Sequence, residues 1–152
     1  MILTQNNDVP EVIASEDLSL DEQLLDACEK GSSNEEVMEL IQKGGNYKTK
    51  TFDNWTVLHK ASRNGHKDLV QAFIELEPEL VKETTNLGQT ALHLASQGGY
   101  HDIVEILMEW NAEVDARDNF DITPLHLASK YGHIKVATTL VQFGSADFSK
   151  LD

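Results

Sequence analysis

Residues 90–104 read TALHLASQGGYHDIV, and residues 123–137 read TPLHLASKYGHIKVA. A third stretch, residues 56–70, reads TVLHKASRNGHKDLV. Of its 15 positions, the stretch at 90–104 shares seven with the stretch at 123–137 and eight with the stretch at 56–70. Unrelated sequences of ordinary composition would share about one. The copies are offset by 34 and then 33 residues, and a fixed period of this length is the mark of a repeat protein.

Each copy has the pattern of two helices joined by a tight turn. Thr90 stands where a side-chain hydroxyl caps the first helix, and Leu92 and Ala95 follow at helical spacing. Gly99 then ends the first helix, because glycine adopts the left-handed cap conformation. The second helix has its own apolar stripe, and polar stretches at 46–55, 77–89 and 112–122 separate the copies as loops or hairpins. The sequence therefore predicts an all-α helix-turn-helix solenoid with short hairpin loops.

A weaker copy precedes these three, since Ala27 and Gly31 lie 34 residues before Ala61 and Gly65. Pairs of Ser and Glu three residues apart, at 19 and 22 and at 33 and 36, predict capping boxes for its two helices. We expect a repeat domain over residues 19–152, because stacked units bury a continuous core. Its four units span about 19–51, 52–85, 86–118 and 119–152.

The two ends of the array are expected to differ from its middle. In the last unit Ala137 replaces Val104 and Thr139 replaces Ile106, which resembles a polar cap. Residues 144–147 are expected to begin a further hairpin. At the other end, residues 1–29 hold eight Asp or Glu and no Lys or Arg. We expect residues 1–18 to form an acidic flexible tail that can be deleted at little cost in stability.

The composition excludes several classes of function. The chain has 152 residues, with 12 Lys and Arg against 26 Asp and Glu, and a formal net charge of −14. Such a charge argues against binding to nucleic-acid phosphates or to an anionic membrane surface. A single cysteine, Cys28, fits a reducing compartment, and neither a membrane span nor a secretory signal is visible. We expect a cytoplasmic protein, with the nucleus as the alternative, that is a monomer by itself.

Residues 123–128, which read TPLHLA, resemble the signature of the ankyrin repeat. The stretches beginning at Thr56 and Thr90 depart from that signature only at its proline or variable position. The resemblance covers residues 20–148 and implies the ankyrin scaffold. It is weakest at residues 77–81, where Glu77-Pro78-Glu79-Leu80-Val81 replaces the usual start of a hairpin. The family shares a scaffold and not one partner, so the resemblance does not name a ligand.

Nothing in the sequence predicts catalysis, a bound cofactor or a metal. His59, His93 and His126 recur once per unit, about 10 Å apart if the helices stack at usual distances, and ligands of one zinc must converge within about 2 Å of it. The resemblance implies instead that these histidines bond loop backbone and tie neighbouring units together. Cys28 has no histidine before residue 59 to act as its base, and no phosphate-binding loop occurs.

The resemblance implies that the chain binds a partner protein or peptide on a concave face of hairpin tips and first helices. The carried-over contact residues include cations at both ends and one acidic residue, Asp53. We therefore expect a partner with apolar anchors and acidic or phosphorylated groups. Two alternatives stay open: an N-terminal targeting domain of a larger enzyme or lipid-transfer protein, and a stoichiometric enzyme inhibitor. The predicted contact residues are Lys50, Phe52, Asp53, Trp55, Arg63, Asn64, Asn86, Leu87, Gln89, Gln97, Arg117, Asn119, Phe120, Ile122, Lys130 and Tyr131.

Overall fold

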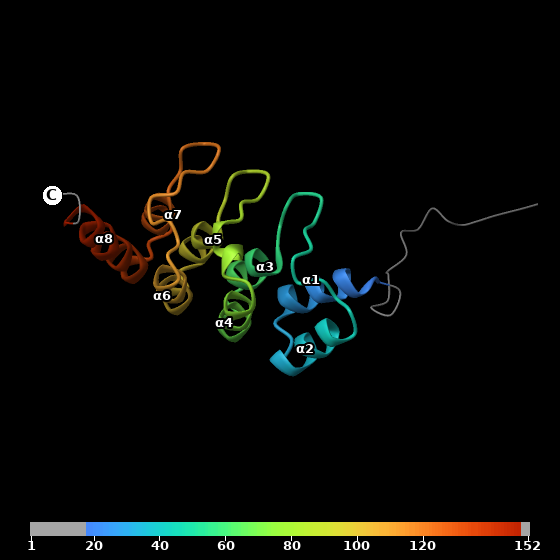
Figure 1. Cartoon of the computed structure of the whole chain (residues 1–152). Coiled ribbons are helices and arrows are strands. Elements are labelled where there is room, and N and C mark those ends of the chain that lie inside the picture. Colours follow the sequence, from blue (N-terminus) through green and yellow to red (C-terminus); the bar gives the residue numbers. More distant parts are fainter. Residues whose placement is uncertain (1–17, 150–152) are drawn as a thin grey trace, which may run out of the picture.

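A computed structural model describes residues 18–149, with side chains as far as residue 144. The predicted tail therefore lies, except for Leu18, outside the described residues. Figure 1 shows pairs of helices stacked side by side, with three hairpin loops projecting from the same side of the stack. The described part contains helices and turns but no strand, as the repeat pattern predicts. The helices are α1 (Leu20–Lys30), α2 (Asn34–Gln42), α3 (Val57–Arg63), α4 (Lys67–Leu76), the 3-10 helix η2 (Pro78–Lys82), α5 (Ala91–Gly98), α6 (His101–Glu109), α7 (Pro124–Lys130) and α8 (Ile134–Ser149).

Side-chain caps begin the helices where the sequence predicts them. The Thr90 hydroxyl accepts a hydrogen bond from the His93 amide at 3.3 Å, and Thr56 and Thr123 do the same for their helices. The predicted capping boxes of α1 and α2 also form. In the three signature units a histidine completes the box, because its Nδ1 accepts from the backbone N–H of the threonine. The starts of α1, α2, α3, α5 and α7 are thus fixed by residues within one turn.

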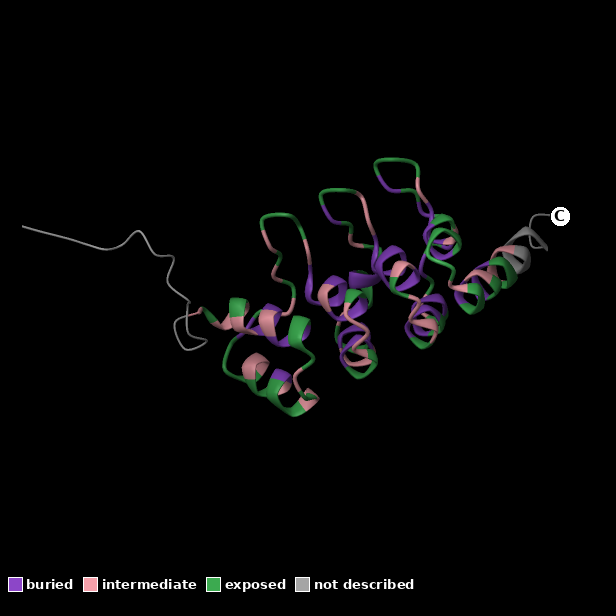
Figure 2. Ribbon diagram, turned by 180° about the vertical axis from the view of Figure 1, so that it is seen from behind, coloured by how far each residue is buried: buried purple, intermediate pink, exposed green. Residues whose placement is uncertain are grey.

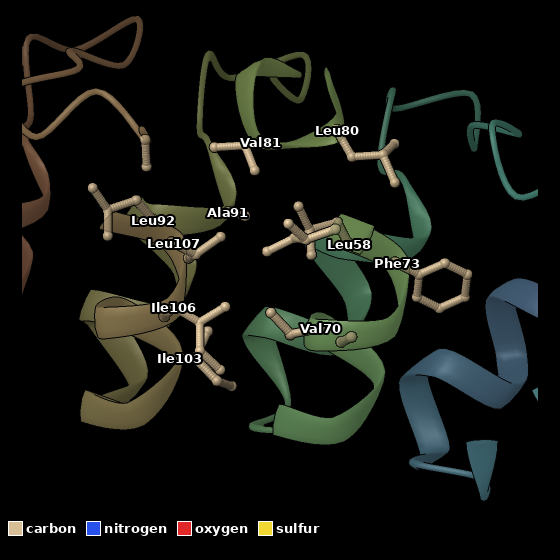
Figure 3. Packing of buried hydrophobic residues seen from close by; sticks show 14 of the residues in the cluster. Leu58, Val70, Phe73, Leu80, Val81, Ala91, Leu92, Ile103, Ile106 and Leu107 are labelled. Carbon is tan, nitrogen blue, oxygen red and sulfur yellow. The ribbon is translucent and has the colours of Figure 1, made fainter. Parts of the chain in front are cut away.

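Stacking of the units makes one core. Leu58, Phe73 and Leu107 are fully buried and belong to three different helices. Figure 3 shows apolar side chains of successive units facing one another between the ribbons. Burial of such side chains is the main term that stabilises the stack, at about 25 cal/mol per Å² of apolar surface.

The second unit differs from the others at the point where the sequence resemblance is weakest. After α4 the chain forms η2, which buries Leu80 and Val81 in the common core. The hairpin that follows still closes, with the Thr85 amide donating to the Gln89 carbonyl at 2.9 Å. The 3-10 helix η2 therefore adds Leu80 and Val81 to the core, and the hairpin after it is kept.

The signature histidines connect neighbouring units, as the resemblance implied. His59 Nε2 lies 3.1 Å from the Glu83 carbonyl oxygen and 3.2 Å from that of Gln89. His93 Nε2 lies 2.8 Å from the Ile122 carbonyl oxygen. Both rings are fully buried, and burial lowers the pKa of His59 from 6.5 to about 4 and also lowers the pKa of His93.

The buried histidines predict that stability falls in mild acid. Because the pKa of His59 is lower in the folded than in the unfolded chain, the unfolded chain binds more protons as pH falls below about 6.5. We expect His59 alone to reduce the free energy of unfolding by about 1 kcal/mol between about pH 7 and about pH 5.5, with His93 adding in the same direction. Urea unfolding across this window tests the prediction, and His59→Gln should flatten the slope. A stability that stays constant or rises toward pH 5.5 would contradict it.

The C-terminal unit contradicts two of our expectations. Thr139 does not form a polar outer surface: it is buried, and its hydroxyl lies 2.8 Å from His101 Nε2. Ala137 packs partly against the core. The exposed large apolar residues of α8 are Ile134 and Val141, so the cap prediction is wrong at this end. The backbone at 144–147 also stays helical within α8, where a hairpin was expected.

Candidate partner-binding surface

The three hairpins share one backbone geometry. In each hairpin a backbone N–H donates to the carbonyl four residues later, at 2.9 Å from Thr51 to Trp55 and at 3.0 Å from Asp118 to Ile122. The residue before the acceptor has a positive φ, and this position is held by Asn54, Gly88 and Asp121. Asn, Asp and Gly are the residues that adopt this conformation most readily. The two residues before each positive-φ residue therefore lie at the tip of the hairpin.

Hydrogen bonds join the hairpin tips into a row. The Asn86 amide donates to the Asp53 carbonyl, and the Asn119 amide donates to the Leu87 carbonyl, both at 2.9 Å. The side-chain amide of Asn119 donates to the Asn86 carbonyl at 2.8 Å, and that of Asn86 donates to the Phe52 carbonyl at 3.4 Å. Asn86 and Asn119 were predicted as partner contacts, and the structure shows that their amides also hold neighbouring tips together. The row is thus preorganised.

Each tip presents one large apolar side chain to solvent. Phe52 is 92% exposed, Leu87 is 52% exposed and Phe120 is 67% exposed. Figure 2 shows the tips of the three loops as exposed. A folded protein does not gain stability from side chains in this position, so their presence on three adjacent tips indicates a surface suited to contact with a partner.

Aromatic and cationic side chains meet where the hairpins join the first helices. The Trp55 ring has Lys60 Nζ and the Arg63 guanidinium each at 5.3 Å from its centroid. In the last unit Lys130 Nζ lies 5.5 Å from the centroid of the Tyr131 ring. Both arrangements lie within cation–π range. The sequence prediction missed Lys60, although Lys60 lies three residues before the predicted contact Arg63 on α3 and therefore on the same side of that helix.

The cations of this surface differ in what they already bind. Lys50 Nζ forms an ion pair with Glu83 at 2.7 Å. No ion pair within residues 18–149 involves Arg63, Arg117 or Lys130. The second helices and the loops that follow them carry exposed carboxylates instead, at Glu75, Glu79, Asp102, Glu105, Glu109 and Glu113.

We call the hairpin tips together with the exposed side of the first helices the hairpin face. All sixteen predicted contact residues keep some exposure. The exposed ones are Lys50, Phe52, Asp53, Arg63, Asn86, Leu87, Arg117, Asn119, Phe120, Lys130 and Tyr131. The half-buried ones are Trp55, Asn64, Gln89, Gln97 and Ile122.

Two features away from the hairpin face carry groups of chemical interest. His101, Asp102 and Glu105 place ligand atoms within 4.8 Å of one another at the start of α6, and the sequence analysis predicted no metal ligands there. Cys28 is fully buried, and burial raises the pKa of its thiol from 9.0 to about 12. Such a thiol is a poor nucleophile at neutral pH, as expected for a structural cysteine.

Paired helices, capping histidines and a row of bonded hairpins define a helical repeat protein. The chain matches the family model for ankyrin repeats, in three copies, over residues 24–118 and 80–152. It belongs to the ankyrin-repeat family, which confirms the resemblance and the fold class. Ankyrin repeats are generally protein–protein interaction modules and are typically not enzymes. Within the described part of the chain, no helix is both long and apolar enough to cross a bilayer.

Proposed function

We propose that this chain binds a partner protein or peptide through its hairpin face, the concave side of the predicted solenoid. The observation that carries the proposal is the row of three exposed apolar tips held in place by backbone hydrogen bonds. A preorganised surface loses little conformational entropy on binding, so ordering costs fall mainly on the partner.

The partner is a segment with apolar anchors and acidic or phosphorylated side chains. Phe52, Leu87 and Phe120 supply apolar contacts, and Trp55 and Tyr131 are of the types that dominate binding hot spots. Arg117 and Arg63 have no ion pair in the described part of the chain, so their guanidinium groups are available to carboxylates or phosphates. The exposed carboxylates of the second helices repel an acidic partner from the opposite side. The chain acts as a monomer inside the cell, and it binds neither nucleic acid nor membrane.

Charge reversal on the hairpin face tests the electrostatic part of this proposal. A partner is first isolated by affinity capture and identified, and its affinity for the double variant Arg117→Glu with Lys130→Glu is then measured. We expect affinity to fall at least about tenfold while the melting temperature stays unchanged, because both side chains are exposed and unpaired within residues 18–149.

The matched control makes the same charge change away from the hairpin face. Lys43→Glu with Lys67→Glu alters two exposed lysines at the ends of the second helices α2 and α4. This control should change affinity by less than about threefold, since surface charges distant from an interface act mainly through screened long-range forces. Unchanged or tighter binding by the Arg117 and Lys130 variant would refute an acidic partner.

A further inference from the structure

Three side chains of metal-ligating types meet on one side of α6. His101 Nδ1 lies 3.3 Å from a carboxylate oxygen of Glu105 and 3.9 Å from one of Asp102. Two ligand atoms that each lie about 2.1 Å from one tetrahedral zinc ion are about 3.4 Å apart. The separation of His101 and Glu105 is therefore that of two ligands of one ion.

A chain of hydrogen bonds from α8 determines which nitrogen of the His101 ring carries the proton. The Thr139 hydroxyl donates to the Lys135 carbonyl oxygen at 3.0 Å, within its own helix. Its oxygen therefore accepts from His101 Nε2, which lies 2.8 Å away, so Nε2 carries the proton of the neutral imidazole. Nδ1 is left with a free lone pair beside two carboxylates. These electron-rich groups repel one another unless a cation lies between them.

The bond to Thr139 is also the support that a metal-binding histidine needs. A ligating imidazole almost always donates its second N–H to an oxygen, which fixes the orientation of the ring and its tautomer. Thr139 supplies that oxygen from the neighbouring unit, and it is buried in the junction where α8 packs beside α6 (Figure 1). This contact comes from outside the three-residue cluster, so it is independent evidence for a ligand at Nδ1.

Of the four units, only the third carries this set of residues. The positions of His101, Asp102 and Glu105 are held in the second and fourth units by Lys67, Asp68, Gln71, Ile134, Lys135 and Thr138. The position of Thr139 is apolar in the two preceding units, where it is held by Ala72 and Ile106. Packing of the junction does not require a hydroxyl at this position. The two departures from the repeat pattern, at His101 and at Thr139, meet in one hydrogen bond.

We propose that His101, Asp102 and Glu105 bind one Zn²⁺ ion, with Thr139 as the positioning residue. A ligand set of one imidazole nitrogen and two carboxylates suits zinc, whereas Ca²⁺ and Mg²⁺ take oxygen ligands alone. Water completes the tetrahedron. The ion holds the His101 ring against α8 and so stabilises the junction between the third and fourth units. The site lies away from the hairpin face and does not rest on the proposed function.

Two lysines near the cluster oppose a bound cation. Lys67 Nζ lies 4.0 Å from the Asp102 carboxylate, and Lys67 and Lys135 both line a cavity of about 200 Å³ beside it. We therefore expect Lys67→Gln to strengthen zinc binding about two- to fivefold. Lys43→Gln is the matched control, because it releases the carboxylate of Glu39 from an ion pair on α2 and should leave the affinity unchanged.

Zinc titration of the full chain, freed of metal with a chelator, tests the site by isothermal titration calorimetry at neutral pH. We expect one strongly bound ion per chain. Glu105→Gln removes a charged ligand at an exposed position and should weaken binding at least about tenfold. Glu109→Gln is the matched control, since it removes an exposed carboxylate one turn further along α6, and it should change the affinity less than about twofold.

The role of Thr139 is tested by variants that leave all three ligands in place. Thr139→Val removes the oxygen that accepts from His101 and should weaken zinc binding about ten- to a hundredfold, whereas Thr139→Ser keeps the hydroxyl and should retain the affinity. Nitrogen-15 NMR of the His101 ring gives a readout that a merely structural role would not move. Zinc should shift Nδ1 while the proton stays on Nε2.

Three results would overturn the proposal. Equal zinc affinity of the original chain and Glu105→Gln would show that the ion binds scattered surface carboxylates. A His101 ring that keeps protons on both nitrogens at saturating zinc would show that a proton, and not a metal, joins the ring to Glu105. The third result is a titration without one-to-one binding.

Discussion

Phe73→Ala is expected to lower the free energy of unfolding by about 3–5 kcal/mol. The Phe73 ring is fully buried in α4 and lies on the side of the second unit that faces the first (Figure 3). Truncation removes its contacts with both units and leaves a cavity that helices held by their neighbours can close only in part. Denaturant unfolding followed by circular dichroism measures the change.

Phe52→Ala is the matched control, since it removes the same atoms from a side chain that is 92% exposed. We expect it to change the free energy of unfolding by less than about 0.5 kcal/mol. A similar loss of stability in both variants would show that the tip of the first hairpin packs against the molecule, and it would contradict the assignment of Phe52 to a binding surface.

His93→Ala is expected to lower the free energy of unfolding by about 3 kcal/mol. Removing the imidazole leaves buried polar groups without a partner in two units, and each such group costs about 1–3 kcal/mol. The imidazole accepts from the Thr90 backbone through Nδ1 and reaches the Ile122 carbonyl of the next unit through Nε2. Chemical denaturation of the purified variant gives the value.

Comparison of His93→Ala with His126→Ala separates the contribution of the helix cap from that of the hydrogen bond between units. It removes the same helix cap, but His126 is exposed and has no acceptor for Nε2 within residues 18–149. We expect a cost of about 1 kcal/mol, the usual value of an N-cap interaction. Equal costs for the two variants would mean that the bond between units contributes nothing to stability.

The sequence was sufficient to predict the features that depend on nearby residues. The 34- and 33-residue offsets set the stacking, and the threonine and serine caps are complete within one turn of each helix. The role of His93 followed from the family resemblance. The conformation of residues 77–82 could not be predicted in this way, because a 3-10 helix there depends on the core that receives Leu80 and Val81.

The details of the hairpin face depend on contacts between units, and the sequence pattern contains little information about them. Lys50 was predicted as a partner contact, but its amine is paired with Glu83, 33 residues away. The side-chain amides of Asn86 and Asn119 likewise bond to a neighbouring hairpin tip that is more than 30 residues away in the sequence. Thr139 was predicted to lie on an outer surface, because it is a polar residue at the position where the preceding unit has Ile106. The sequence does not show that Thr139 is hydrogen-bonded to His101 inside the stack. These partners are visible only when units are stacked.

The most direct test of the account is the affinity of the identified partner for a chain with all three tips made polar, Phe52→Ser with Leu87→Ser and Phe120→Ser, measured by isothermal titration calorimetry. The three side chains are exposed, so the melting temperature should stay within about 2 °C of that of the original chain. We predict that affinity falls at least about tenfold, which corresponds to about 1.4 kcal/mol. Binding of unchanged affinity, by a variant that remains folded, would contradict the claim that the hairpin tips hold the partner.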